Sequence, residues 1–152
     1  MNDNLTHTSD TFRPDTLNYQ IFNLNAPYSN PYQGNAPRWL FVCSAGLLRS
    51  PTAAHVAVTM GANARSCGSH TEYALIPLSA NLIAWADAIF FVNPENFKEA
   101  LRTFKNTGWE DDIQSKSTVW DIPDRYEIGH PELFNMIKNH LEDFKASAKN
   151  LT

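Results

Sequence analysis

The sequence predicts an α/β fold with three layers, in which a four-stranded parallel sheet has helices on both faces. Short, continuous apolar runs alternate with stretches of helical periodicity, which is typical of parallel sheets covered on both sides. Ser and Pro mark the points at which helices should begin. The 152 residues, 43% of them hydrophobic, suffice for one such domain. In these sheets ligands bind at the carboxyl ends of the strands, so we expect the functional residues there.

The expected elements follow one another along the chain. The first strand is the apolar run at 39–42, and Ser50-Pro51 should form the N-cap and first residue of the helix behind it. The other strands are expected at 64–69, 88–92 and 118–120. The other helices are expected to begin at Ser79, Pro94 and Pro131, and the last of them is long. The acidic residues at 110–112 are interpreted as a solvated loop.

Residues 1–37 differ in composition from the rest and are interpreted as an N-terminal extension. This segment is rich in Asn, Pro, Tyr and Thr, which favour turns and extended chain, and we expect it to be mobile or loosely attached. The alternative is that Tyr19, Ile21, Phe22 and Leu24 pack as a short strand or a docked arm. Residues 38–152 then form the domain that carries the site.

Composition and charge exclude several classes of function. The formal net charge is -4 and there is no run of Lys or Arg, which argues against a nucleic-acid partner. Cys43 and Cys67 are the only cysteines, and the five histidines show no metal-ligand spacing, so we expect no disulfide framework, metal or cofactor. Neither a signal-peptide pattern nor an apolar run of membrane-spanning length is present, and the expected location is the cytoplasm, with no membrane partner.

The segment from Cys43 to Ser50 is the strongest candidate for a functional site. A short loop between a buried strand and a helix N-terminus turns backbone N–H groups inward, and the helix dipole adds positive charge. Gly46 suits a left-handed backbone angle, and Arg49 can donate two N–H bonds to one phosphate. We therefore expect residues 43–49 to form a phosphate loop after the first strand. Its phosphate-binding residues are expected to be Ser44, Ala45, Gly46, Leu47, Leu48 and Arg49.

The thiol of Cys43 is the expected nucleophile. Donors that hold a phosphate dianion also favour a thiolate, and the Ser50 hydroxyl is placed to donate a hydrogen bond to the sulfur. Five residues separate Cys43 from Arg49, which lets the chain circle one phosphate. Attack by sulfur would give a phosphocysteine that water hydrolyses. A carboxylic acid at a neighbouring strand end, Asp124 or else Asp121, would protonate the leaving oxygen.

At these residues the chain resembles the low-molecular-weight protein tyrosine phosphatases, in particular a compact bacterial branch. The resemblance runs from about residue 38 to the final helix. It rests on Val-Cys-Ser-Ala-Gly-Leu-Leu-Arg-Ser-Pro-Thr-Ala at 42–53 and on the segments 66–69, 85–92 and 121–126. It implies a four-stranded parallel sheet and a site without metal. The roles it implies are nucleophile for Cys43, phosphate clamp for Arg49, thiolate partner for Ser50 and general acid for Asp124.

Three positions depart from the family pattern, and one of them is Leu48, which stands where many relatives carry a second loop cysteine that protects the nucleophile by forming a disulfide. Gly46 stands where the family usually has Asn, which helps to hold the shape of the loop. Arg125 stands between the acid and Tyr126, whereas many members follow the acid with Pro-Tyr. Tyr126 is expected to stack on the ring of a substrate, and the alternative is that it covers the core.

Three functions fit this site. The leading hypothesis is a cysteine-dependent phosphomonoesterase, a protein tyrosine phosphatase, whose substrate carries phosphotyrosine or another aryl phosphate. The second is a module that binds phosphate with little or no turnover. The third, an arsenate reductase, relays a disulfide through additional cysteines, and the presence of only two cysteines disfavours it. The sequence does not indicate an oligomeric state.

Overall fold

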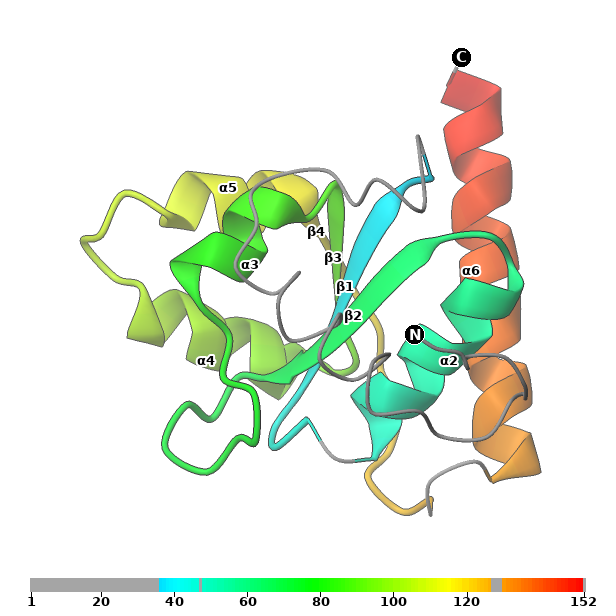
Figure 1. The fold of residues 1–152 in the computed structure, drawn as a ribbon, viewed down its shortest axis with the longest axis horizontal. Coiled ribbons are helices and arrows are strands. Elements are labelled where there is room, and N and C mark those ends of the chain that lie inside the picture. Colours follow the sequence, from blue (N-terminus) through cyan, green and yellow to red (C-terminus); the bar gives the residue numbers. More distant parts are fainter. Residues whose placement is uncertain (1–35, 47, 127–129, 152) are drawn as a thin grey trace, which may run out of the picture.

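A computed structural model describes residues 36–46, 48–126 and 130–151. Four parallel strands form one sheet in the order β2-β1-β3-β4 (Figure 1). The strands are β1 (Arg38–Cys43), β2 (Asn63–Gly68), β3 (Ala88–Phe91) and β4 (Ser117–Val119). The predicted α/β class with a four-stranded parallel sheet is confirmed.

Helices cover both faces of the sheet, as the sequence predicts. They are α2 (Arg49–Thr59), α3 (Ala80–Trp85), α4 (Pro94–Thr103), α5 (Glu110–Lys116) and α6 (Pro131–Leu151). Helices α2 and α6 lie on one face, and α3, α4 and α5 lie on the other (Figure 1). Successive side chains of β1 enter opposite layers: Trp39, Phe41 and Cys43 face α2 and α6, whereas Leu40 and Val42 face the other three helices.

Aromatic rings fix the position of β1 within the sheet. Phe41 and Phe90 stack with their ring centroids 4.9 Å apart, and Trp120 lies against both rings. Both phenylalanines are fully buried, and burying a side chain of this size contributes about 1.5–3 kcal/mol. Because β1 lies between β2 and β3, its last residue, Cys43, is held in the middle of the carboxyl edge of the sheet.

The predicted helix starts at Ser79, Pro94 and Pro131 are confirmed. The Ser79 hydroxyl caps α3 by accepting a hydrogen bond from the Leu82 N–H at 3.3 Å. Asn93 caps α4 in the same way, directly ahead of Pro94. These caps place the N-terminus of α4 just beyond the carboxyl end of β3.

The prediction of an acidic loop at 110–112 is wrong, because these residues form the first turn of α5. Their carboxylates interact favourably with the positive end of the helix dipole. Ile113 is fully buried beneath them, and the Lys116 ammonium in the last turn donates to the Ile83 carbonyl at 2.7 Å. A cluster of acidic residues in the sequence does not by itself distinguish a helix N-terminus from a loop.

The start of α2 also differs from the prediction. The helix begins at Arg49, and Leu48 occupies the N-cap position without a side-chain hydrogen bond, so Ser50 is not the cap. The Ser50 hydroxyl instead contacts the sulfur of Cys43 and the carbonyl of Cys67. The first turn of the helix therefore begins inside the phosphate loop.

Of the predicted N-terminal extension, only residues 36 and 37 are described. The interpretation of residues 1–37 thus lies outside the described residues and stays a prediction. Within the described ranges, no helix has both the length and the apolar character needed to cross a membrane.

His140 on α6 couples the stability of the core to pH. Its ring stacks on buried Trp120 with 4.9 Å between the centroids. Burial lowers the pKa of His140 from its ordinary value, and the nearby charge of Asp143 opposes this effect. The unfolded chain therefore binds a proton at a higher pH than the folded protein does. The stability that depends on the neutral ring is complete above the unfolded pKa of about 6.5 and is lost as the pH falls through the folded pKa.

We expect the substitution His140→Phe to weaken this pH dependence, because phenylalanine keeps a ring on Trp120 and cannot be protonated. As the pH is lowered from about 8 to about 5, the thermal unfolding midpoint of the wild type should fall more than that of the variant. The difference between the two midpoints at the upper end of this range measures the change in packing alone. Parallel curves across the range would contradict the assignment.

Candidate active site

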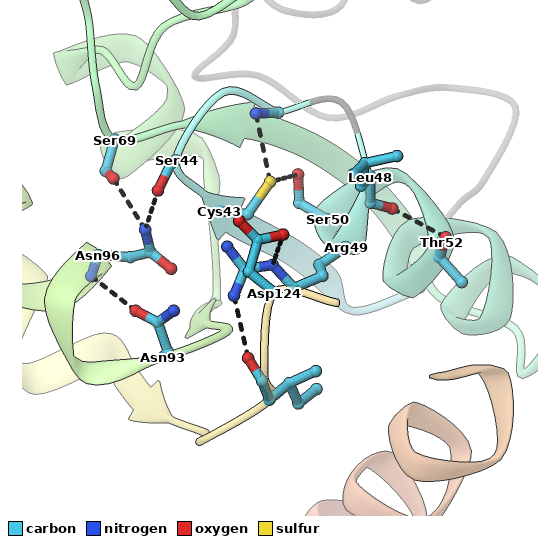
Figure 2. Close-up of polar contacts among 12 residues, drawn as sticks. Cys43, Ser44, Leu48, Arg49, Ser50, Thr52, Ser69, Asn93, Asn96 and Asp124 are labelled. Carbon is cyan, nitrogen blue, oxygen red and sulfur yellow. Dashed lines mark hydrogen bonds and ion pairs between the residues drawn. The ribbon is translucent and has the colours of Figure 1, made fainter. Parts of the chain in front are cut away.

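The carboxyl edge of the sheet gathers the predicted catalytic side chains. Cys43 ends β1, Arg49 begins α2, and Asp124 lies in the segment that follows β4. That segment continues beside β3, since the N–H groups of Trp120 and Ile122 donate to carbonyls at the end of β3 and just after it, at 2.8 and 2.9 Å. Figure 2 shows the Cys43, Arg49, Ser50 and Asp124 side chains converging there.

The sulfur of Cys43 is buried and contacts two polar groups. The Gly46 N–H donates to Sγ at 3.2 Å, and the Ser50 hydroxyl lies 3.0 Å from Sγ (Figure 2). The same hydroxyl is 3.3 Å from the Cys67 carbonyl. A thiol can donate to the Ser50 oxygen while the hydroxyl hydrogen points at Cys67, whereas a thiolate requires that hydrogen for itself. The hydroxyl can thus interact with both protonation states of the Cys43 sulfur.

Hydrogen bonds to the loop carbonyls set the direction of the loop amides. Three successive carbonyls, those of Cys43, Ser44 and Ala45, accept hydrogen bonds from the segment 69–75. The donors are the N–H groups of Ser69, His70 and Leu75, at 2.8, 3.0 and 3.4 Å. In a trans peptide the C=O and the following N–H point in opposite directions, so the N–H groups of residues 44–46 point away from this segment. The Gly46 contact with Sγ agrees with that direction, and the arrangement suits an oxyanion.

Arg49 is buried, and two contacts with the segment after β4 orient its guanidinium. One Nη donates to the Ile122 carbonyl at 3.0 Å, and Nε lies 3.7 Å from a carboxylate oxygen of Asp124. The Ile122 bond uses one of the five N–H donors of a guanidinium, which leaves a fork available for phosphate oxygens. The Asp124 side chain is 66% exposed, so that an incoming substrate can reach it. Asp121, the second candidate acid, is exposed as well.

Two glycines allow the loop to approach the end of β2. Gly46 has φ of 77°, the left-handed angle that the sequence predicts. A Cβ atom at Gly46 would lie 3.0 Å from the Cys67 carbonyl carbon, and one at Gly68 would lie 2.6 Å from the Ser44 oxygen. A methyl group at Gly68 would therefore overlap the loop backbone, and one at Gly46 would be tight against the end of β2 and strained by the positive φ.

The remaining predicted site residues are Leu47, Leu48 and Tyr126. Leu47 lies outside the described residues, and Leu48 is partly exposed at the rim of the loop. Tyr126 was expected to face a substrate ring, but it is buried in the core with 6% of its surface exposed. The Arg125 guanidinium lies over its ring at 5.1 Å and donates to its hydroxyl at 3.0 Å. The alternative that Tyr126 covers the core therefore fits the structure.

Two features of the site were missed in the sequence. Asn96 on α4 binds Ser44 of the loop. The sequence pattern that could have indicated this position is Asn93-Pro94, a junction between a strand and a helix like the one at the phosphate loop. The segment 70–76 after β2 exposes two large side chains, Tyr73 at 74% and Leu75 at 76%, beside the loop. The sequence gives no periodic pattern there from which this exposure could be predicted.

Comparison with solved structures identifies the fold. The YwlE arginine phosphatase from Geobacillus stearothermophilus is 20% identical, with a TM-score of 0.52 over 76% of this chain and 96% of its own. The tyrosine phosphatase Wzb from Escherichia coli K30, in complex with phosphate, is 12% identical, with a TM-score of 0.57 over 74% and 98%. A protein tyrosine phosphatase from Entamoeba histolytica is 16% identical, with a TM-score of 0.57 over 76% and 98%.

The chain thus has a phosphatase-type α/β fold with a cysteine at the end of its first strand. More specifically, it has the fold of the low-molecular-weight tyrosine phosphatases, as the resemblance in the sequence implies. No family model matches the sequence, and a search of curated proteins finds no significant match.

A pair of glycine variants tests the packing of the phosphate loop. Gly61 also has a positive φ, 93°, but nothing lies within 4 Å of a Cβ placed there. Gly61→Ala should therefore cost only the left-handed strain of about 1–2 kcal/mol. Gly46→Ala should cost about 1–3 kcal/mol more, because its methyl group meets the backbone of β2. Urea unfolding of the two variants measures this difference, and equal losses would contradict the close approach.

Proposed function

We propose that the protein is a cysteine-dependent phosphomonoesterase that acts on phosphotyrosine or another aryl phosphate. The observation that carries the proposal is the environment of the Cys43 sulfur, which accepts the Gly46 N–H and contacts the Ser50 hydroxyl at the N-terminus of α2. Such contacts can hold the sulfur in place for attack on phosphorus, and the thiolate is the nucleophilic form of cysteine. The phosphatase titles of the similar structures support the same chemistry.

In the first step, the thiolate attacks phosphorus. A bond forms between Sγ of Cys43 and phosphorus, and the bond between phosphorus and the aryl oxygen breaks. Asp124 in its acid form gives a proton to the departing oxygen, which leaves as a phenol. The loop amides and the Arg49 guanidinium bind the three non-bridging oxygens as their charge is redistributed.

In the second step, water hydrolyses the phosphocysteine. The Asp124 carboxylate takes a proton from the attacking water, the new oxygen–phosphorus bond forms, and the bond from phosphorus to Sγ breaks. Inorganic phosphate leaves and the thiolate is restored, with the Ser50 hydroxyl turned towards the sulfur. Water is the only reactant besides the chain and the ester that these two steps require.

The exposed rim of the loop favours an aromatic leaving group. Leu48, Tyr73 and Leu75 are the large apolar side chains exposed around or beside the loop, and the Leu75 N–H is bonded to the Ala45 carbonyl. These side chains offer apolar surface to a ring, a role that buried Tyr126 cannot fill. Because the similar structures include tyrosine and arginine phosphatases, phosphotyrosine and phosphoarginine peptides are the two substrates to compare first.

Cys67 disfavours the arsenate reductase alternative. Its thiol is buried, and burial raises its pKa well above the ordinary value, with a smaller contribution from nearby Cys43. A thiol that stays protonated inside the core is a poor relay for a disulfide. Both cysteines are free, which fits the reducing cytoplasm that we propose as the location.

We expect Cys43→Ser to lower the hydrolysis of para-nitrophenyl phosphate by at least about a thousandfold, because the variant lacks the nucleophile. Cys67→Ala, which alters the other cysteine, should retain the activity and serves as the control. Binding of phosphate by Cys43→Ser without turnover is expected. If wild-type protein bound phosphate and hydrolysed no phosphate ester, it would be a binding module instead.

Asp124→Ala should reduce kcat by about 100-fold or more, since general acid catalysis contributes about 10²–10⁴-fold. The loss should be greater for phenyl phosphate than for para-nitrophenyl phosphate, because the poorer leaving group depends more on protonation. Steady-state kinetics on both esters measure the ratio. If Asp121→Ala gave this pattern and Asp124→Ala did not, the acid would be Asp121.

A further inference from the structure

We propose that Asn96 is a positioning residue that holds the phosphate loop in shape from outside, by binding the side chain of Ser44. This inference rests on the function proposed for the loop and concerns what keeps its amides directed at the Cys43 sulfur. Asn96 comes from the first turn of α4, a helix that contributes no other residue to the site described above.

The carboxamide of Asn96 connects two separate segments. Its Nδ2 donates to the Ser44 hydroxyl at 3.1 Å and to the Ser69 hydroxyl at 3.2 Å (Figure 2). Ser44 belongs to the phosphate loop, whereas Ser69 begins the segment whose N–H groups bind the loop carbonyls. One amide group thus ties the loop to the segment that orients its peptides.

A carboxylate fixes the direction of these hydrogen bonds. The Ser69 hydroxyl lies 2.7 Å from a carboxylate oxygen of Glu99, one turn further along α4 than Asn96. An ionised carboxylate only accepts, so Ser69 donates its proton to Glu99 and its oxygen is left to accept from Asn96. The amide therefore presents its NH₂ group to both serines, and Ser44 keeps its own hydroxyl proton.

Stability does not account for an asparagine at this position. Asn96 is only 1% exposed, and among the described residues its Oδ1 has no hydrogen-bond partner. A buried, unpaired carbonyl costs about 1–3 kcal/mol, and each such group in a folded protein calls for an explanation. The contact with the loop supplies one, because an apolar side chain would fill the same space and leave the Ser44 hydroxyl without this hydrogen bond.

The loop cannot be held from within. Between Cys43 and Arg49 the residues are Ser, Ala, Gly, Leu and Leu, so Ser44 carries the only polar side chain. A side chain at Gly46 would be crowded and strained, because a Cβ placed there would lie 3.0 Å from the Cys67 carbonyl carbon and the φ is 77°. A shift of Ser44 would move the next two peptides and withdraw the Gly46 N–H from Sγ.

The test compares Asn96→Ala with Asn93→Ala. Asn93 is the N-cap of α4, so its loss weakens the helix and leaves the Ser44 contact in place. Two readouts that need no turnover are measured on the full chain: the affinity for vanadate and the pH profile of Cys43 alkylation by iodoacetamide. For Asn96→Ala we expect about tenfold weaker vanadate binding and an alkylation profile shifted to higher pH. Asn93→Ala should lower the unfolding midpoint with neither of these changes.

Ser44→Ala completes the experiment. It removes the other end of the contact, so it should reproduce both changes, and the double variant with Asn96→Ala should lose no more than either single one. Alkylation profiles for Asn96→Ala and wild type that coincide would overturn the proposal, as would equal shifts in Asn93→Ala. If wild type hydrolyses no phosphate ester but the profiles differ as expected, the proposed enzyme fails and the role of Asn96 stands.

Discussion

The site depends on the close approach of the phosphate loop to the end of β2. Two residues without side chains face each other there, Gly46 in the loop and Gly68 on the strand, and a methyl group on either would collide with the opposite backbone. The approach lets the loop carbonyls reach the N–H groups of the segment 69–75. With these carbonyls bound on the outside, the N–H groups of the same peptides point away from the segment 69–75, and that of Gly46 donates to the Cys43 sulfur. Backbone geometry, more than any polar side chain, therefore builds the site.

Local chemistry made the centre of this site predictable from the sequence. A buried strand ending in Cys43, a glycine where a left-handed angle is needed and an arginine at the start of a helix are each recognisable without coordinates. The errors arose where the outcome depends on distant parts of the chain. The packing of the segment after β4 decides whether Tyr126 faces a ligand or the core. Ser50 does not cap the helix, and its hydroxyl lies close to the Cys43 sulfur instead. Asn96 lies 52 positions from its partner Ser44, and no local pattern joins them.

The fold and the chemistry rest on different grounds. The similar structures share the architecture of this chain but are only 12–21% identical to it. They therefore establish the fold, and the reaction is inferred from the side chains. Within this chain, the Cys43 thiol, the Arg49 guanidinium and the Asp124 carboxylate come from three segments that the parallel sheet brings to one edge. The related family usually has an asparagine at the position of Gly46, whereas here the carboxamide of Asn96 on α4 binds the loop at Ser44.

The external hydrogen bonds of the loop carbonyls mean that the receptor for an oxyanion is assembled during folding, before any ligand arrives. The conformational entropy of the loop is then lost during folding, and this loss does not reduce the affinity for an oxyanion. A loop that is ordered in advance should also bind a phosphoryl group on a substrate and free inorganic phosphate with similar affinity. For the phosphatase proposed above, free phosphate would therefore compete with every substrate for the loop.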